Sequence, residues 1–150
     1  MNFFLREATI DDASLLFDWV NDKDVRLNSI NQETIIWENH LKWLKNRLNS
    51  KDTFIYILSD GEINYGQIRI DNHYNWWTID YSIDVNNRGK GFGSSIVNLL
   101  IEKCKNFNFK AFVKKSNLSS IQVFVKLGFI EVKGELESMT YFEKIQIDEK

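Results

Sequence analysis

The chain has 150 residues, of which 43% are hydrophobic and 14% aromatic, so it can bury one sizeable core but is too short for two typical domains. Its net charge is −2, its single cysteine excludes an internal disulfide, and its two histidines offer no zinc-ligand spacing. The first residues lack a signal-peptide pattern, and no apolar stretch approaches the length that spans a bilayer. We therefore expect one cytoplasmic domain over residues 1–150, with no metal and no membrane partner.

The first half of the chain predicts one strand, two helices and then three strands. Residues 3–8 alternate as in a strand, and Thr9 is a suitable cap for a helix over residues 13–20. We expect a polar turn over residues 21–32. The next helix is indicated by a spacing of four, three and four residues between Trp37, Leu41, Leu44 and Leu48. Three antiparallel strands separated by tight turns are expected at residues 53–59, 65–71 and 76–85.

The second half predicts a helix, a strand, a short helix and two closing strands. The first helix carries a buried stripe of Phe92, Ile96, Leu99, Leu100 and Cys104. A strand over residues 109–113, a helix over 119–127 ended by Gly128, and strands over 128–132 and 139–145 follow. Only one connection between strands crosses over through a long helix. The strands at residues 76–85 and 109–113 should therefore lie parallel.

Residues 84–93, with the sequence DVNNRGKGFG, concentrate glycines and cations at the start of a predicted helix. Gly89, Gly91 and Gly93 permit backbone angles that let several amides turn toward one anion, while Arg88 and Lys90 add positive charge. A dinucleotide fingerprint would need a further glycine where Ser94 stands, and a P-loop would need Ser or Thr where Gly91 stands. A phosphate cradle remains, or a purely structural glycine turn.

Residues 86–126 hold eight basic residues against one acid, so the rest of the chain is acidic. This asymmetry favours a local site for a polyphosphate ligand over duplex nucleic acid. Lysines that merely solvate helix faces are the alternative.

Two motifs resemble the GNAT superfamily of acyl-CoA N-acyltransferases. The family's coenzyme loop, Gln or Arg followed by two residues, Gly, one residue and Gly or Ala, is matched by Arg88, Gly91 and Gly93. A downstream pattern of Asn, three residues to Ser, and a helix ending in Gly-Phe is matched by Asn117, Ser120 and residues 128–129. The predicted order of strands and helices, β-α-α-β-β-β-α-β-α-β-β, fits the same family.

The resemblance implies an α/β (α+β) GNAT fold, with a mixed sheet, central antiparallel strands and a splayed parallel pair that binds acetyl-CoA. The pantetheine arm would pair with backbone near residues 83–85, and an amide of Ile83 or Asp84 would stabilise the oxyanion. The expected coenzyme contacts are Ile83, Asp84, Val85, Arg88, Gly89, Lys90, Gly91, Phe92, Gly93, Ser94, Asn117, Ser120 and Phe124.

Transfer of an acetyl group to an amine needs a base for the amine proton and a route for the thiolate to leave. Many family members carry a tyrosine acid at the position of Phe124, so water, Ser120 or Tyr141 would have to replace it. Asn117 would hold that water or the pantetheine, or would simply cap a helix. The candidates for the base are Asp80, Tyr81, Glu38 and His40, although Asp80 could instead pair with Arg69. The catalytic set is thus Asp80, Tyr81, His40 and Asn117.

Residues 25–44 are similar to a GNAT branch that acetylates amino-sugar nucleotides in bacterial surface-glycan pathways, including the pseudaminic acid pathway. Polar side chains beside tryptophans suit a sugar, because indole stacks on apolar ring faces, but the tryptophans could equally pack the helix into the core. This resemblance rests on Arg26, Asn28, Ser29, Trp37, His40 and Trp43, and the expected acceptor contacts are Asn28, Ser29, Trp37, His40 and Arg69.

We therefore expect an N-acetyltransferase that moves acetyl from acetyl-CoA to a primary amine of a small acceptor, by direct attack in a ternary complex. The alternatives are acetylation of a protein N-terminus, as on ribosomal proteins, and a coenzyme-binding module without strong catalysis. A monomer or homodimer with no nucleic-acid partner is expected.

Overall fold

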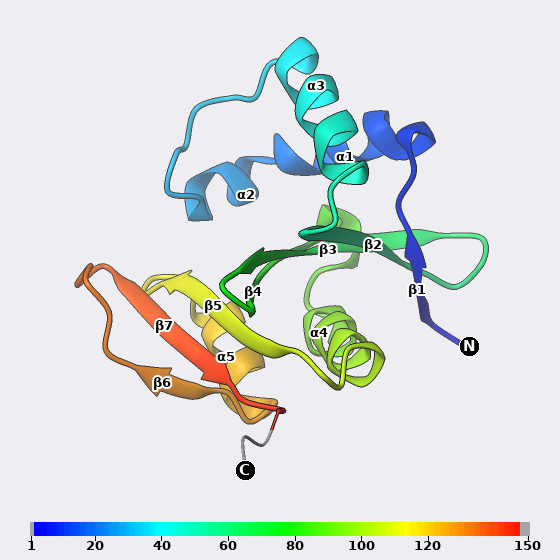
Figure 1. The fold of residues 1–150 in the computed structure, drawn as a ribbon. Coiled ribbons are helices and arrows are strands. Elements are labelled where there is room, and N and C mark those ends of the chain that lie inside the picture. The colour runs from blue at the N-terminus through cyan, green and yellow to red at the C-terminus, as the bar shows by residue number, and fades with distance from the viewer. Residues whose placement is uncertain (1, 148–150) are drawn as a thin grey trace.

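A seven-stranded mixed sheet in the order β1-β2-β3-β4-β5-β7-β6 organises the molecule (Figure 1). The computed structural model describes residues 2–147. The strands are β1 (Phe4–Glu7), β2 (Thr53–Ser59), β3 (Asn64–His73), β4 (Trp76–Ile83), β5 (Asn108–Lys114), β6 (Ile130–Val132) and β7 (Met139–Lys144). β4 pairs with β5 in parallel, whereas the other recorded pairs are antiparallel. The predicted mixed α/β fold and its parallel pair are confirmed.

Helices cover both faces of this sheet. They are α1 (Ala13–Val20), α2 (Lys23–Asn28), α3 (Trp37–Leu48), α4 (Phe92–Lys103) and α5 (Leu118–Lys126), with 3-10 turns at Ile10–Asp12 and Val85–Asn87. In Figure 1 the first three helices gather on one side of the sheet and α4 and α5 on the other. Among the described residues, no helix is long and apolar enough to cross a membrane.

The prediction of a plain polar turn at residues 21–32 is wrong, because α2 forms there. Asp22 caps this helix, and its carboxylate accepts hydrogen bonds from the amides of Asp24 and Val25. A helix of six residues without a buried side chain has no apolar periodicity, so the sequence pattern could not reveal it.

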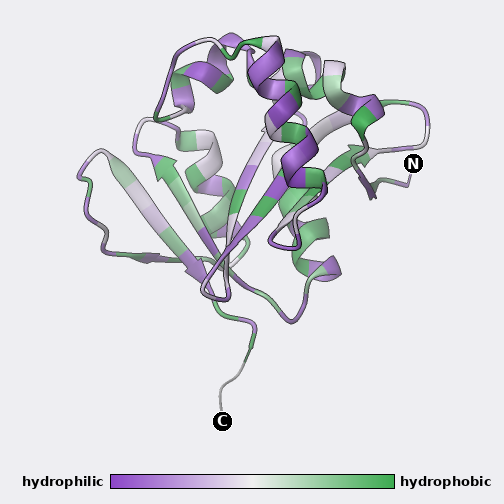
Figure 2. Ribbon diagram, turned by 45° about the horizontal axis from the view of Figure 1, so that its top comes forward, coloured by the Kyte–Doolittle hydropathy of each residue, from purple (hydrophilic) through white to green (hydrophobic). Residues whose placement is uncertain are grey.

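Two hydrophobic clusters lie on opposite faces of the sheet because successive strand residues point to opposite sides. Ile55 and Ile57 of β2 pack with Trp19 of α1 and Leu44 of α3. The larger cluster lies on the other face and contains the neighbouring β2 residues Tyr56 and Leu58, the inner faces of α4 and α5, and aromatic rings of β5 and β7. Figure 2 shows the alternation of hydrophilic and hydrophobic residues along α3 that this arrangement requires.

The parallel strands stay together for only a short distance. Trp76, Trp77 and Thr78 pair with residues 108–110, whereas residues 79–83 of β4 keep a partner only on the β3 side. The two strands therefore diverge toward the carboxyl end of β4, where ligands bind in parallel sheets.

Candidate active site

A cleft of about 600 Å³ lies where β4 and β5 diverge. Its walls come from residues 79–83 of β4, the glycine loop with the start of α4, residues 112–114 of β5, the first turns of α5, and α2. We call it the coenzyme cleft, because it brings together the two segments that carry the family resemblance.

The glycine loop presents free backbone donors to this cleft. Gly89 and Gly91 have φ values of +75° and +84°, and Gly91 is the N-cap of α4 without a capping side chain. The first hydrogen bond of this helix runs from the amide of Ser95 to the carbonyl of Gly91, and the structure records no acceptor for the amides of residues 88–94 among residues 2–147. Such a run of donors at the positive end of a helix fits a pyrophosphate.

Arg88 lines the coenzyme cleft but is already engaged. Its guanidinium donates to Asp22 at 2.8 Å and Asp24 at 3.0 Å, and its Nε donates to the carbonyl of Ile83. Burial raises the pKa of Asp22, but hydrogen bonds from Arg88 and from the amides of the α2 cap outweigh it, so the pKa is lowered overall. Arg88 thus fastens α2 to β4, and each of its three guanidinium nitrogens already has an acceptor. Lys90 is exposed, with its Nζ 3.4 Å from the carbonyl of Asn86.

The directions of the β4 amides determine which of them face the gap between β4 and β5. The amide of Asp84 donates to the carbonyl of Tyr65 at 2.8 Å, so it is not free for a thioester oxygen. Because amides alternate along a strand, those of Ile83 and Tyr81 point away from β3, toward the gap. The carboxylate of Asp84 accepts from the indole of Trp19 and from the amide of Asn86, a supporting role, and Val85 lies exposed in the following 3-10 turn.

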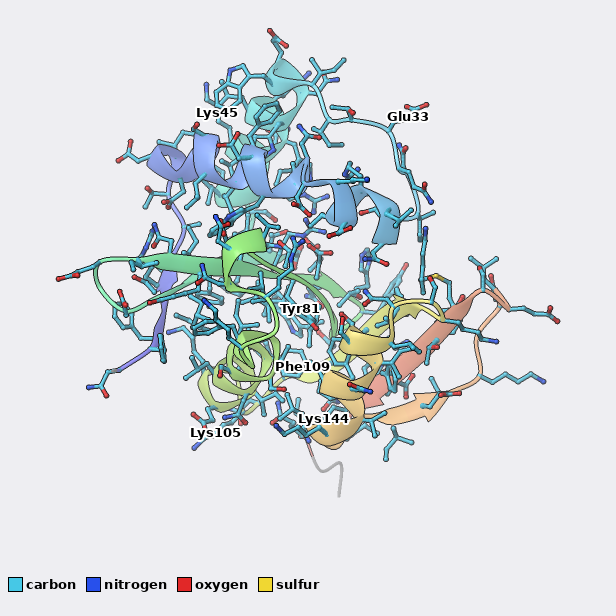
Figure 3. All side chains as sticks on the ribbon, turned by 180° about the vertical axis from the view of Figure 1, so that it is seen from behind. Glu33, Lys45, Tyr81, Lys105, Phe109 and Lys144 are labelled. Carbon is cyan, nitrogen blue, oxygen red and sulfur yellow. The ribbon has the colours of Figure 1, made fainter. Side chains whose placement is uncertain are left out.

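Tyr81 lies between α4 and α5, as Figure 3 shows. Its hydroxyl is 2.9 Å from the hydroxyl of Ser120, and its ring meets the buried ring of Phe124 edge-on. Asn117 caps α5 by accepting from the amide of Ser120, while its side chain also lines the cleft. Tyr141 is bound elsewhere, since its hydroxyl accepts the amide of Leu136.

A second cleft of about 510 Å³ lies on the face of the sheet that carries the first three helices, between these helices, β3 and β4. We call it the acceptor cleft. It shares four lining residues with the coenzyme cleft, namely Val25, Ser29, Asp80 and Ser82. The two clefts therefore adjoin at β4.

Asp80 stands at this junction with its side chain 57% exposed. Its carboxylate accepts from Gln67 at 3.2 Å and lies 3.9 Å from Nη1 of Arg69. This separation exceeds hydrogen-bond distance, so Asp80 keeps room for a further partner. The expected cross-strand ion pair exists, but it is a loose one.

The other predicted acceptor residues are divided by the fold. Asn28 lines the coenzyme cleft, and Arg69 lines the acceptor cleft. Trp37 packs edge-on against Phe17 outside the lining of both clefts, and Glu38 is exposed outside them as well.

His40 lies in the wall of the acceptor cleft but is 4% exposed. Its Nε2 lies 3.2 Å from the carbonyl of Ala13, and because a carbonyl only accepts, this nitrogen carries the proton and cannot take another. Burial lowers the pKa of His40, and the bond to Ala13 offsets this only in part. His40 was predicted to act as a base, but its Nε2 cannot accept a proton from the substrate.

The sequence indicated Trp43 as one of the tryptophans suited to a sugar but did not indicate Gln67, and both line the acceptor cleft. Trp43 lies three residues after His40 and stacks on its ring, with centroids 6.0 Å apart. The helical spacing from His40 had predicted this shared face. Among residues 2–147, no group of three or more His, Cys, Asp or Glu side chains could hold a metal ion.

Comparison with known proteins agrees with this geometry. Residues 2–130 match the family model of the acetyltransferase (GNAT) domain. The chain belongs to this family, a class of acetyl-CoA-dependent N-acetyltransferases, and the resemblance first read from the glycine loop is confirmed.

One curated relative and two solved structures illustrate the similarity. The uncharacterised protein MJ1062 of Methanocaldococcus jannaschii is 26% identical over 157 residues, which covers 93% of this chain and 30% of that protein, so the chain spans under a third of its relative. The spermidine N-acetyltransferase of Vibrio cholerae, solved with CoA and spermine, has a TM-score of 0.85 at 13% identity, covering 96% of this chain and 95% of that one. AAC(6')-Ib with ribostamycin and coenzyme A has a TM-score of 0.81 at 19% identity, covering 96% and 93%.

Proposed function

We propose that this domain transfers the acetyl group of acetyl-CoA to a primary amine of a small acceptor, by direct attack within a ternary complex. The observation that carries the proposal is the contact between the two clefts at Asp80 and Ser82. An amine in the acceptor cleft can reach a thioester in the coenzyme cleft across the gap between the diverging strands. No covalent enzyme intermediate is then required.

The backbone holds the coenzyme in this proposal. Amides of residues 88–94 bind the pyrophosphate, and the lack of an acceptor for them in the described part of the chain supports that role. When bound, acetyl-CoA supplies the activated acetyl group as a thioester. The free amides of Ile83 and Tyr81 face the arm of the coenzyme, and one of them stabilises the charge that develops on the thioester oxygen.

Asp80 acts as the base, directly or through one water. Its position in both cleft walls and its exposed carboxylate support this assignment. The negative charge also attracts the acceptor as an ammonium ion before the proton is removed. The Gln67 amide donates to the same carboxylate and orients it.

Tyr81 acts as the proton donor to the departing thiolate. Burial raises the pKa of Tyr81, and the hydrogen bond with Ser120 offsets this only in part, so the hydroxyl is protonated at neutral pH and suits an acid better than a base. It approaches the ring of Phe124, the position at which many relatives carry a tyrosine. A hydroxyl from β4 therefore takes the place of one from α5.

An amino-sugar nucleotide remains the proposed acceptor. The indole of Trp43 beside polar and charged side chains in the acceptor cleft supports a sugar ring with hydroxyls. Its phosphates would extend toward the basic side chains in that cleft.

The direct test measures release of free CoA thiol with a panel of primary amines, alongside calorimetry with acetyl-CoA alone. Turnover with at least one small amine is expected. Saturable coenzyme binding without turnover on any amine would indicate a coenzyme-binding module instead of an enzyme. Turnover restricted to peptide N-termini would show that the acceptor is a protein N-terminus and not a small amine. Absence of coenzyme binding would overturn the proposal altogether.

A further inference from the structure

Within residues 2–147, Arg69 is the one arginine whose Nη atoms make no hydrogen bond. Its Nε donates to Asp71 at 2.8 Å, but neither Nη has a hydrogen-bond acceptor among the described residues. The other arginines, Arg6, Arg26, Arg47 and Arg88, all donate from at least one Nη. Arg69 lines the acceptor cleft, so its free donors face an accessible space.

The guanidinium of Arg69 is also held in place. Its Cζ lies 5.1 Å from the ring centroid of Trp43, and its Nε donates a hydrogen bond to Asp71 at 2.8 Å. A stacked guanidinium with two parallel free donors matches the geometry of a carboxylate or phosphate, and little side-chain freedom is lost on binding.

The charges around the acceptor cleft favour an anion as well. Its lining holds two cations, Arg26 and Arg69, and one carboxylate, Asp80, while Asp71 lies outside the lining and forms an ion pair with Nε of Arg69. Arg26 spends its donors on backbone carbonyls and on Ser29, so Arg69 is the cation left to meet a ligand. A polycationic acceptor would find one carboxylate facing it, whereas an amine with an attached anion would find a partner for each charge.

We propose that Arg69 binds an anionic group, a carboxylate or a phosphate, that is carried by the acceptor amine. This inference rests on the proposed function and names the chemical class of its acceptor. The Nη1 and Nη2 donors bind two oxygens of the anion, and Asp80, 3.9 Å away, receives the amine of the same molecule. Arg69 thereby orients the acceptor toward the gap between β4 and β5.

Calorimetry on the CoA-loaded protein tests this without relying on turnover. The probes are matched pairs: glucosamine 6-phosphate against glucosamine, and glycine against glycinamide, with spermidine as a polycation. The member of at least one pair that carries the phosphate or carboxylate should bind about 10- to 100-fold more tightly than its partner without that group, as expected for charge-assisted hydrogen bonds. The pair that shows the preference identifies phosphate or carboxylate as the anion.

Variants then assign the preference to its source. Arg69→Gln should remove the preference, and Arg69→Lys, which keeps the charge but loses the fork, should retain only part of it. Arg47→Gln is the control, because Arg47 contacts the same Asp71 and lies over the same Trp43 without lining the cleft. The control should bind the probes as the wild type does.

Equal binding of both members in both pairs, including no binding by any, would overturn the inference, and so would tightest binding of spermidine. A preference that survives in Arg69→Gln would do the same. A lost preference in Arg69→Gln together with a complete absence of acetyl transfer would uphold the anion site while refuting the proposed function.

Discussion

The hydroxyl oxygen of Tyr81 on β4 lies 2.9 Å from the hydroxyl oxygen of Ser120 on α5, and this contact joins two walls of the coenzyme cleft. The same α5 presents Phe124 where many relatives have a tyrosine. The ring of Tyr81 on β4 meets that of Phe124 edge-on, with centroids 5.9 Å apart.

Replacing Tyr81 with Phe should lower kcat by up to about 100-fold, because a thiolate with a reference pKa of about 8.5 leaves moderately well without an acid. The KM for acetyl-CoA should stay nearly constant. Ser120→Ala removes the hydrogen-bond partner but keeps the phenol, so it should cost much less. Adding Phe124→Tyr to Tyr81→Phe should restore part of the activity, and unchanged kcat in Tyr81→Phe would reject the acid assignment.

Replacing Gly91 with Val should weaken coenzyme binding at least about tenfold, measured by calorimetry with CoA. The space that a Cβ at Gly91 would enter is open, with no atom within 4 Å, so the cause is backbone strain at φ +84°, where a residue with a Cβ costs about 1–2 kcal/mol. The loop relieves that strain by turning its amides away from the pyrophosphate.

Gly61→Val is the matched control for this change. Gly61 lies in the loop between β2 and β3 with φ +99°, and the space around it is equally open. A valine at this position would therefore be strained to a similar degree, but far from the cleft. We expect a comparable loss of thermal stability with unchanged CoA affinity. Equal CoA affinity in both variants would contradict the phosphate cradle.

Replacing Asp80 with Asn should lower kcat by about 10²- to 10⁴-fold, because the amide cannot take the proton of the acceptor amine. CoA affinity should not change, since the glycine loop is untouched. The decisive measurement is kcat over a pH series: if Asp80 is the base, raising the pH should partly rescue the variant as more of the amine loses its proton in solution. A variant with full activity at neutral pH would remove Asp80 from the mechanism.

The stability of the protein should fall as the pH drops below about 6.5, the ordinary pKa of histidine. Burial lowers the pKa of His40 in the folded state, so between the two pKa values the unfolded chain binds a proton that the folded chain does not. Stability therefore rises with pH in this window, by at most about 1.4 kcal/mol per pH unit for one group.

Urea denaturation from pH 5 to 7 measures this dependence. His40→Gln should flatten it, whereas His73→Gln, at an exposed position, should leave it as in the wild type. The carboxylates whose pKa values are lowered, such as Asp12 and Asp22, lose their contribution only at more acidic pH. An identical slope in His40→Gln would show that the buried imidazole does not control it.

Local patterns revealed most of the fold. The apolar spacing from Trp37 to Leu48 marked α3 at its observed bounds, and β-branched residues marked β2, because both depend on which face of an element is buried. The single crossover between β4 and β5 required a parallel pair. α2 was not predicted, because a short exposed helix is stabilised by its Asp22 cap rather than by a buried apolar stripe.

The sequence by itself determined the family and the glycine loop, since Gly89 and Gly91 permit left-handed backbone angles locally, wherever the rest of the chain lies. Only the tertiary structure decided which side chains remain free for ligands. Arg88 is occupied by carboxylates 64 and 66 residues away, His40 by the carbonyl of Ala13, while Arg69 and Asp80 stay open. Whether a polar group is free for a ligand depends on hydrogen-bond partners that come from distant segments of the chain. No local sequence pattern indicates which partners these are.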